Sequence, residues 1–174
     1  LFYLQTVKEK SPKSVNEYFI DLRTLFRFIK VQRGLVSTDT PLSDIKVNDV
    51  DIDLIRTVTL TDAYEFMNYA KTERGNNSST RLRKSSALRG FFNYLCVKKH
   101  LIETDPLKEL EAPKQKKSLP KYLTLEQSIE LLESVDGSHK ERDYCIITLF
   151  LNCGLRLSEL VGLNVSDIRR DNTA

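Results

Sequence analysis

The feature that most limits the fold is a run of apolar residues with helical spacing in the first fifth of the chain. Between Ser11-Pro12 and Gly34, apolar side chains recur every three or four residues. A serine before a proline is a typical helix start, and a glycine is a typical end. The spacing therefore predicts an amphipathic helix over 11–34. Its apolar stripe comprises Val15, Tyr18, Phe19, Leu22, Leu25, Phe26 and Ile29.

Three further segments of the first hundred residues show helical periodicity. A short helix is predicted over 1–9, and longer ones over 59–75 and 78–99. Residues 35–58 contain a proline and scattered aspartates, so we expect a loop there with one helical turn near Ser43. Because strand signals are almost absent and the connections are short, the predicted fold class is mainly α, with a four-helix bundle at the front.

The composition changes after this bundle. Three prolines and a lysine-rich run follow closely on one another, and both residue types keep a segment extended and solvated. We therefore predict a first domain over 1–107, a basic linker over 108–121 and a second domain over 122–174. The lysines of the linker run are Lys114, Lys116 and Lys117.

The second domain opens with two helix signals. Thr124 and Gln127 have the spacing of a capping box, which starts a helix. The segment 141–153 is nearly apolar all round from Tyr144 onward, so we expect it to be a buried helix that ends at Gly154. A domain this short has little apolar surface to bury, which suggests that further sequence completes it.

The basic residues are unevenly distributed, although the net charge is only +3. Residues 80–101 contain six basic residues and no acidic one, whereas residues 36–73 contain eight acidic residues and three basic ones. Such an asymmetry gives one face a positive field. Charge alone leaves open whether this face binds nucleic acid or is ordinary solvated helix surface.

The cysteines and histidines do not form a recognisable site. Cys96, Cys145 and Cys153 lack CxxC spacing, and the two histidines, His100 and His139, are isolated. We expect no metal, no cofactor and no disulfide, and a reducing compartment. No apolar run approaches the roughly 20 residues that span a bilayer, so no membrane contact is predicted and the expected location is cytoplasmic.

One stretch, Asn152-Cys-Gly-Leu-Arg-Leu-Ser-Glu-Leu160, carries candidate chemistry. A helix is predicted to stop at Gly154 and another to begin near Ser158, which places Arg156 in the corner between them. An arginine in apolar company needs an anionic partner. Glu159, one helical turn away, and an external phosphate are both possible partners.

This stretch resembles the first box of the tyrosine recombinases, the family of Xer recombinases and phage integrases. The family pattern is close to T-G-(L/M)-R-(L/I)-S-E-(L/A). Residues 154–160 match it, while Cys153 stands in the place of the threonine. Leu163 and Asp167-Ile168 fit the continuation of the pattern, with Val165 in the place of the usual tryptophan.

The resemblance extends over essentially the whole chain. Residues 119–124 look like the family's start of the catalytic domain, and the four front helices are similar to its core-binding domain. The resemblance therefore implies a SAM-like helical bundle, a linker and the helical start of a mixed α/β catalytic domain.

The resemblance also implies roles for two residues. Arg156 would grip the scissile phosphate, Glu159 would support it, and neither metal nor cofactor would be needed. The rest of the family's site, including the tyrosine nucleophile, lies after this box, and all seven tyrosines here precede it. We expect this chain to bind double-stranded DNA without cutting it. Its parent would cut and rejoin DNA through a 3′-phosphotyrosine, as a tetramer on paired recombination sites.

Three groups of residues are candidate DNA contacts, because the family clamps the duplex between its two domains. Exposed N–H groups at a helix start, basic side chains along a helix and a lysine-rich linker all suit phosphate or base edges. Two alternatives remain: a non-catalytic DNA-binding regulator or accessory protein, and a helical protein-interaction module. The candidates are Lys13, Ser14, Asn16, Arg81, Arg83, Lys84, Ser85, Arg89, Lys114, Lys116 and Lys117.

Overall fold

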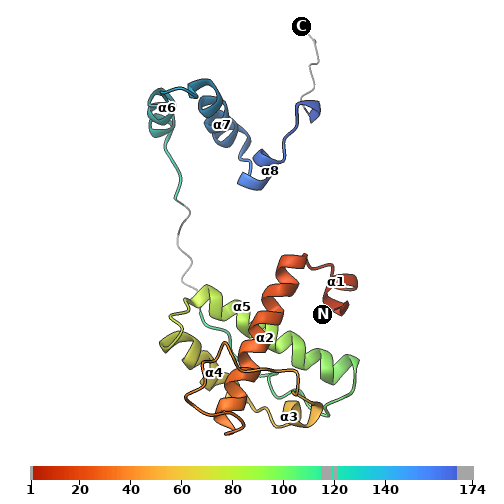
Figure 1. The fold of residues 1–174 in the computed structure, drawn as a ribbon. Coiled ribbons are helices and arrows are strands. Elements are labelled where there is room, and N and C mark those ends of the chain that lie inside the picture. Colours follow the sequence, from red (N-terminus) through yellow and green to blue (C-terminus); the bar gives the residue numbers. More distant parts are fainter. Residues whose placement is uncertain (1, 115–118, 120, 168–174) are drawn as a thin grey trace. The chain divides into compact units, whose positions relative to one another are not determined.

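A computed structural model describes residues 2–114, 119 and 121–167, and it divides the chain into two compact units, 1–117 and 118–174 (Figure 1). Within the described residues every regular element is a helix, which confirms the mainly α class.

The front unit contains five α-helices and a π-helical turn among its described residues. The three longest helices match the segments 11–34, 59–75 and 78–99 that the periodicity predicts. The expected turn near Ser43 is present, but α3 was not predicted. The elements are α1 (Phe2–Thr6), α2 (Pro12–Gln32), α3 (Ile52–Arg56), α4 (Leu60–Thr72), α5 (Ser78–Asn93) and η1 (Tyr94–Lys98).

Side-chain caps fix where the long front helices begin. The Ser11 hydroxyl accepts a hydrogen bond from the Ser14 backbone N–H at the start of α2. Thr59 and Asp62 cap α4 reciprocally, each side chain accepting from the other's backbone N–H. The Asn77 side-chain oxygen accepts from the Thr80 backbone N–H at the start of α5. Such caps satisfy backbone donors that have no partner inside the helix.

The core of the front unit lies between α2, α4 and α5, and α2 and α5 cross one another in Figure 1. Leu25 of α2, Phe66 of α4 and Phe92 of α5 are fully buried there. Leu107 and Leu110, which follow η1, are buried in the same core. Packing thus continues past residue 107 into the first residues of the segment expected as linker.

An ion pair and hydrogen bonds to backbone carbonyls attach the long loop before α3 to α2. The Lys30 ammonium, almost buried, donates to both carboxylate oxygens of Asp49 and to the Lys46 carbonyl. The hydrogen bond from Lys30 lowers the pKa of Asp49. Arg27 donates to the Ile45 carbonyl, so this segment is held on α2 at several points despite its lack of long helices.

The second unit contains three α-helices and a 3₁₀ turn among its described residues. The capping box of Thr124 and Gln127 is present at the start of the first, as expected. The helix 141–153 was predicted to be buried, and that prediction is wrong: none of its residues is buried. The elements are α6 (Leu125–Glu133), α7 (Lys140–Cys153), α8 (Leu157–Val161) and η2 (Val165–Asp167).

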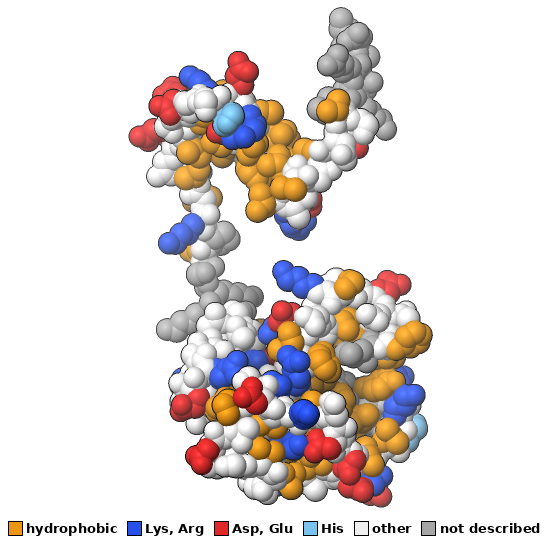
Figure 2. All heavy atoms as spheres, viewed as in Figure 1, with side chains coloured by type: hydrophobic (Ala, Val, Ile, Leu, Met, Phe, Trp, Pro, Cys, Tyr) orange, Lys and Arg blue, Asp and Glu red, His pale blue; other side chains and the backbone are white. Residues whose placement is uncertain are grey.

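The exposure of the second unit has a simple physical cause. Its apolar stripes have only one another to pack against within the described residues, and hydrophobic side chains remain open on its surface in Figure 2. A helix that is apolar nearly all round needs neighbours on several sides before it is buried. In the part of the chain that the structure describes, no helix has the length and apolar character needed to cross a bilayer.

Candidate functional site

A sharp corner between α7 and α8 presents Arg156. Gly154 ends α7 with a φ of +61°, a left-handed conformation that glycine adopts without the steric penalty of a Cβ atom. The chain then extends, and Arg156 is the N-cap of α8 with φ −75° and ψ 153°. The corner predicted from the sequence is therefore present, with its glycine at the turning point.

Glu159 holds Arg156 at both its backbone and its side chain. One carboxylate oxygen accepts from the Arg156 backbone N–H at 2.7 Å, and the other accepts from a guanidinium N–H at 2.9 Å. A carboxylate in the first turn also suits the positive end of a helix dipole. Glu159 thereby fixes the direction in which the guanidinium leaves the chain.

The Arg156–Glu159 pair lies at the surface of its unit. The Arg156 side chain is 82% exposed, and Leu157 beside it is 69% exposed. Of the two partners considered from the sequence, Glu159 is therefore in contact with an arginine that its apolar neighbours leave exposed. Because a guanidinium has five N–H donors and Glu159 uses one, further donors remain for two oxygens of a phosphate.

A buried carboxylate on α2 neutralises two of the basic residues of α5. Asp21 is fully buried and accepts from the Arg83 guanidinium at 2.5 Å and from the Lys84 ammonium at 2.8 Å. Glu17 adds a second ion pair to Arg83 at 3.1 Å. The carboxylates and the basic groups balance, as buried charges require.

This arrangement corrects the predicted DNA-binding set. Lys84 is 8% exposed and Ser85 is 1% exposed, so neither presents a surface to DNA. The Ser85 hydroxyl donates to the Arg81 carbonyl inside the unit. Arg83 is partly exposed but already carries two ion pairs. The helical periodicity located α5 correctly, but the sequence did not show on which face each basic side chain lies.

The sequence did contain a signal for Asp21. It lies three residues after Tyr18 and four before Leu25, within the apolar stripe of α2. An acidic residue at such a position needs a cationic partner from a neighbouring helix. Which helix supplies that partner depends on the packing of α2 on α5.

The remaining front candidates are accessible to different degrees. Arg89 is exposed, and Arg81 is partly buried. Lys13 and Asn16 are exposed at the start of α2, whereas the Ser14 backbone N–H already donates to Ser11. Figure 2 shows basic side chains gathered across the middle of the visible face of the front unit.

Only part of the expected linker can be assessed. Lys114 is exposed. Lys116 and Lys117 lie outside the described residues.

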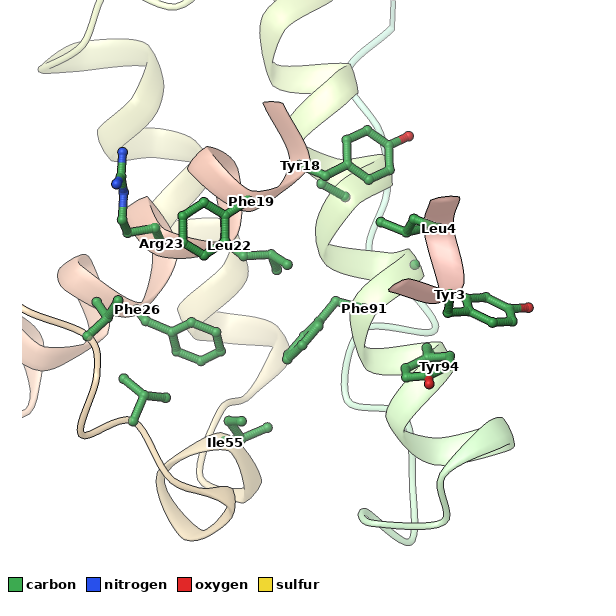
Figure 3. Close-up of a pocket in the computed structure, with 14 residues that line it drawn as sticks. Tyr3, Leu4, Tyr18, Phe19, Leu22, Arg23, Phe26, Ile55, Phe91 and Tyr94 are labelled. Carbon is green, nitrogen blue, oxygen red and sulfur yellow. The ribbon is translucent and has the colours of Figure 1, made fainter. Parts of the chain in front are cut away.

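An apolar cavity of about 350 Å³ lies between α1, α2 and α5 (Figure 3). Leu22, Phe26 and Phe91 line it from α2 and α5, and Leu4 lines it from α1. Its lining is mostly aromatic and aliphatic, so it offers phosphate little to bind. The cavity is a feature of how α1 packs and does not belong to the site at Arg156.

Comparison with known proteins identifies the same region. Residues 121–174 match the model of the phage integrase family. This match includes the corner that carries Arg156 and the helices α6 to α8. No solved structure matches the chain.

Curated relatives extend the similarity to the front unit. The tyrosine recombinase XerC of Caldanaerobacter subterraneus is 52% identical over 171 residues, which are 98% of this chain and 48% of the relative. The XerC proteins of Chlamydia caviae and Chlamydia pneumoniae are 31% and 33% identical, over 97% and 96% of this chain and 54% of each relative. The chain thus spans about half the length of these relatives.

These matches run in the same order as the elements of the structure. The helical front unit, the segment that joins it to the second unit and the box around Arg156 all fall within the aligned range. On the strength of this box, the family match and the similarity along nearly the whole chain, the protein belongs to the tyrosine recombinase family.

Proposed function

We propose that this chain is the DNA-binding front part and the beginning of the catalytic part of a site-specific recombinase. The complete protein would cut and rejoin DNA through a 3′-phosphotyrosine. The observation that carries the proposal is the exposed Arg156 guanidinium, held by Glu159 in a box that matches the family. Its relatives are named as tyrosine recombinases, which does not favour the alternative of a non-catalytic regulator.

The chemistry explains why an arginine is needed at this corner. When a tyrosine oxygen attacks the phosphorus, a bond to that oxygen forms and the bond to the 5′-oxygen breaks. Negative charge builds on the non-bridging oxygens, and a planar guanidinium can donate two hydrogen bonds to them. A lysine would supply the charge without this geometry. Glu159 acts as a positioning residue that restricts the guanidinium.

DNA would be held mainly through its phosphates. Lys13, Arg81, Arg89 and Lys114 remain at least partly accessible in the structure, and each could neutralise a phosphate and release a counterion. Asn16 could contribute a neutral hydrogen bond. We further propose that the complete protein acts as a tetramer on paired recombination sites, in the cytoplasm.

Cleavage by the protein at the full length of its relatives tests the role of Arg156. We expect Arg156→Ala to reduce cleavage of a nicked DNA substrate by roughly 10²–10³-fold, because a preorganised donor to the developing charge is lost. Arg156→Lys should restore little of the rate. Unchanged cleavage by Arg156→Ala would contradict the proposal.

Binding by the chain itself separates recognition from chemistry. The affinity of the 174-residue chain for duplex DNA should fall steeply as salt rises, since binding releases counterions. Arg156→Ala should leave that affinity nearly unchanged, because one contact among many is removed. Absent or salt-insensitive binding would favour a protein-interaction module instead.

A further inference from the structure

A groove lined by polar and charged side chains lies along α5 in the front unit. It lies where α5 faces the segment that follows η1, and its volume is about 360 Å³. The α5 residues that line it are spaced three and four apart, which places them on one side of the helix. The lining residues are Ser86, Arg89, Gly90, Asn93, Asp105 and Lys108.

Two cations line this groove without an anionic partner. Neither the Arg89 guanidinium nor the Lys108 ammonium makes an ion pair or hydrogen bond among the described residues. Arg83 and Lys84, in the middle of the same helix, are paired with the carboxylates of Asp21 and Glu17. The basic residues on the inner side of α5 thus have carboxylate partners, whereas Arg89 at the groove has none in the part of the chain that the structure describes. The unpaired positive charge favours binding of an external anion.

Gly90 leaves the floor of the groove open. It lies inside α5, where glycine is less favourable than alanine because its backbone is more flexible when unfolded. Its φ is not in the left-handed region, and a Cβ built on it would meet no atom within 4 Å. Neither the local conformation nor crowding in the unit therefore requires glycine. Because Gly90 has no side chain, a ligand can approach the helix backbone closely at this position.

The other polar groups of the groove have distinct roles. The Ser86 hydroxyl already donates to the Leu82 carbonyl, so it lines the groove without offering its O–H group to a ligand. The Asn93 side-chain amide is exposed at the groove and can donate. Asp105 accepts from the Leu107 backbone N–H at 2.9 Å, and its carboxylate is the one negative charge in the lining.

We infer that this groove binds a backbone phosphate of DNA, with Arg89 and Lys108 as the charged donors and Asn93 as a neutral one. The inference rests on the proposed function and extends the DNA-binding surface to the segment 105–108. This segment belongs to no helix and forms one wall of the groove. Asp105 fixes the turn that carries Lys108, and its charge weakens the attraction for the phosphate.

Salt titration with a labelled DNA duplex of mixed sequence tests the two cations. For the 174-residue chain, Arg89→Ala and Lys108→Ala should each weaken binding several-fold at low salt and reduce the slope of log affinity against log salt by about 1. Lys71→Ala is the matched control, because Lys71 is exposed on α4 and lines neither the groove nor the core. It should have little effect.

Two substitutions test the groove with opposite expected signs. Asp105→Asn keeps an oxygen that can accept from Leu107 and removes the negative charge, so it should tighten binding, while Glu73→Gln at the C-cap of α4 should not. Gly90→Ala should raise the midpoint of thermal unfolding yet weaken binding, because it strengthens the helix and partly fills the floor. A loss of affinity in a more stable protein cannot be attributed to unfolding.

The outcomes distinguish this inference from the proposed function. If the unaltered chain binds DNA with a steep salt dependence but Lys108→Ala behaves as Lys71→Ala does, the groove is not a phosphate site and the proposed function stands. If the unaltered chain does not bind DNA at all, both are overturned. Thermal unfolding of each variant verifies that the exposed substitutions leave the fold intact.

Discussion

In the front unit the large apolar side chains of α2, α4 and α5 are buried against one another, whereas those of α6, α7 and α8 are at most partly buried. Leu88 and Phe92 of α5 have no exposed surface. In the second unit Leu157, Val161 and Val165 are between 69% and 86% exposed, and α6 to α8 have no buried residue. Both units nevertheless have well-capped helices.

The difference shows that caps and periodicity are enough to define helices but not to stabilise a unit. Most helical stability in proteins comes from burying an apolar face against neighbours. The described helices of the second unit bury their apolar faces only in part. We infer that they are suited to pack against additional apolar surface, and the relatives are about twice as long as this chain.

The largest expected effect comes from separating the two units. Residues 1–117 expressed alone should unfold in one cooperative thermal transition, because their core is complete. Residues 118–174 alone should show no cooperative transition, because little apolar surface is buried. Circular dichroism during heating measures both. A sharp transition for the second unit by itself would break the comparison.

Core truncation should distinguish the units residue by residue. Phe92→Ala in the front unit should lower the free energy of unfolding by about 3–5 kcal/mol, since it leaves a cavity among fully buried side chains. Leu157→Ala, at an exposed position, should change it by less than about 0.5 kcal/mol. Urea titration of the chain gives both values, and equal effects would contradict the contrast.

Asp21 in the front unit and Glu159 in the second unit both hold basic residues, and we expect the buried Asp21 to contribute more to stability than the exposed Glu159. Asp21→Asn should lower the free energy of unfolding by about 3 kcal/mol, because it leaves Lys84 buried without a counter-charge. Glu159→Gln should lower it by less than about 1 kcal/mol, because its pair with Arg156 is exposed. Adding Lys84→Met to Asp21→Asn should recover part of the loss. Failure to recover would indicate that Arg83 carries the effect.

The smallest expected effect concerns acid stability of the front unit. The hydrogen bond from Lys30 lowers the pKa of Asp49 in the folded state, so this pair stabilises the fold above the ordinary carboxyl pKa of about 4. That contribution is lost as the pH falls through the lowered pKa. The stability difference between the unaltered chain and Asp49→Asn should therefore shrink toward acid pH. If this stability difference grew on acidification, the pair would not stabilise the folded state through the ionised Asp49, contrary to the prediction.

Much of the fold followed from local chemistry in the sequence. The caps at Ser11, Thr59 and Thr124 and the turn at Gly154 are made by residues close in sequence, so pattern alone located them. The five-residue α3 was missed because the proline and the scattered aspartates of residues 35–58 favoured a loop there.

The candidate site was predictable where it depends on neighbours in sequence and not where it depends on packing. Arg156 and Glu159 lie three residues apart, and their contact was among the expected possibilities. The burial of Lys84 and Ser85 depends on how α5 lies against α2, over 60 residues away for the Asp21 contact. The groove with Lys108 likewise joins segments that spacing alone does not bring together.

The two ion pairs of Asp21 have a geometric consequence for α5. Successive residues of an α-helix are about 100° apart around its axis, and Asp21 binds two adjacent positions, Arg83 and Lys84, from one side. Turning α5 about its own axis by a single residue would withdraw one of these partners from the buried carboxylate. A buried charge thus sets the rotation of α5 about its axis, and with it the direction in which each exposed side chain of α5 points.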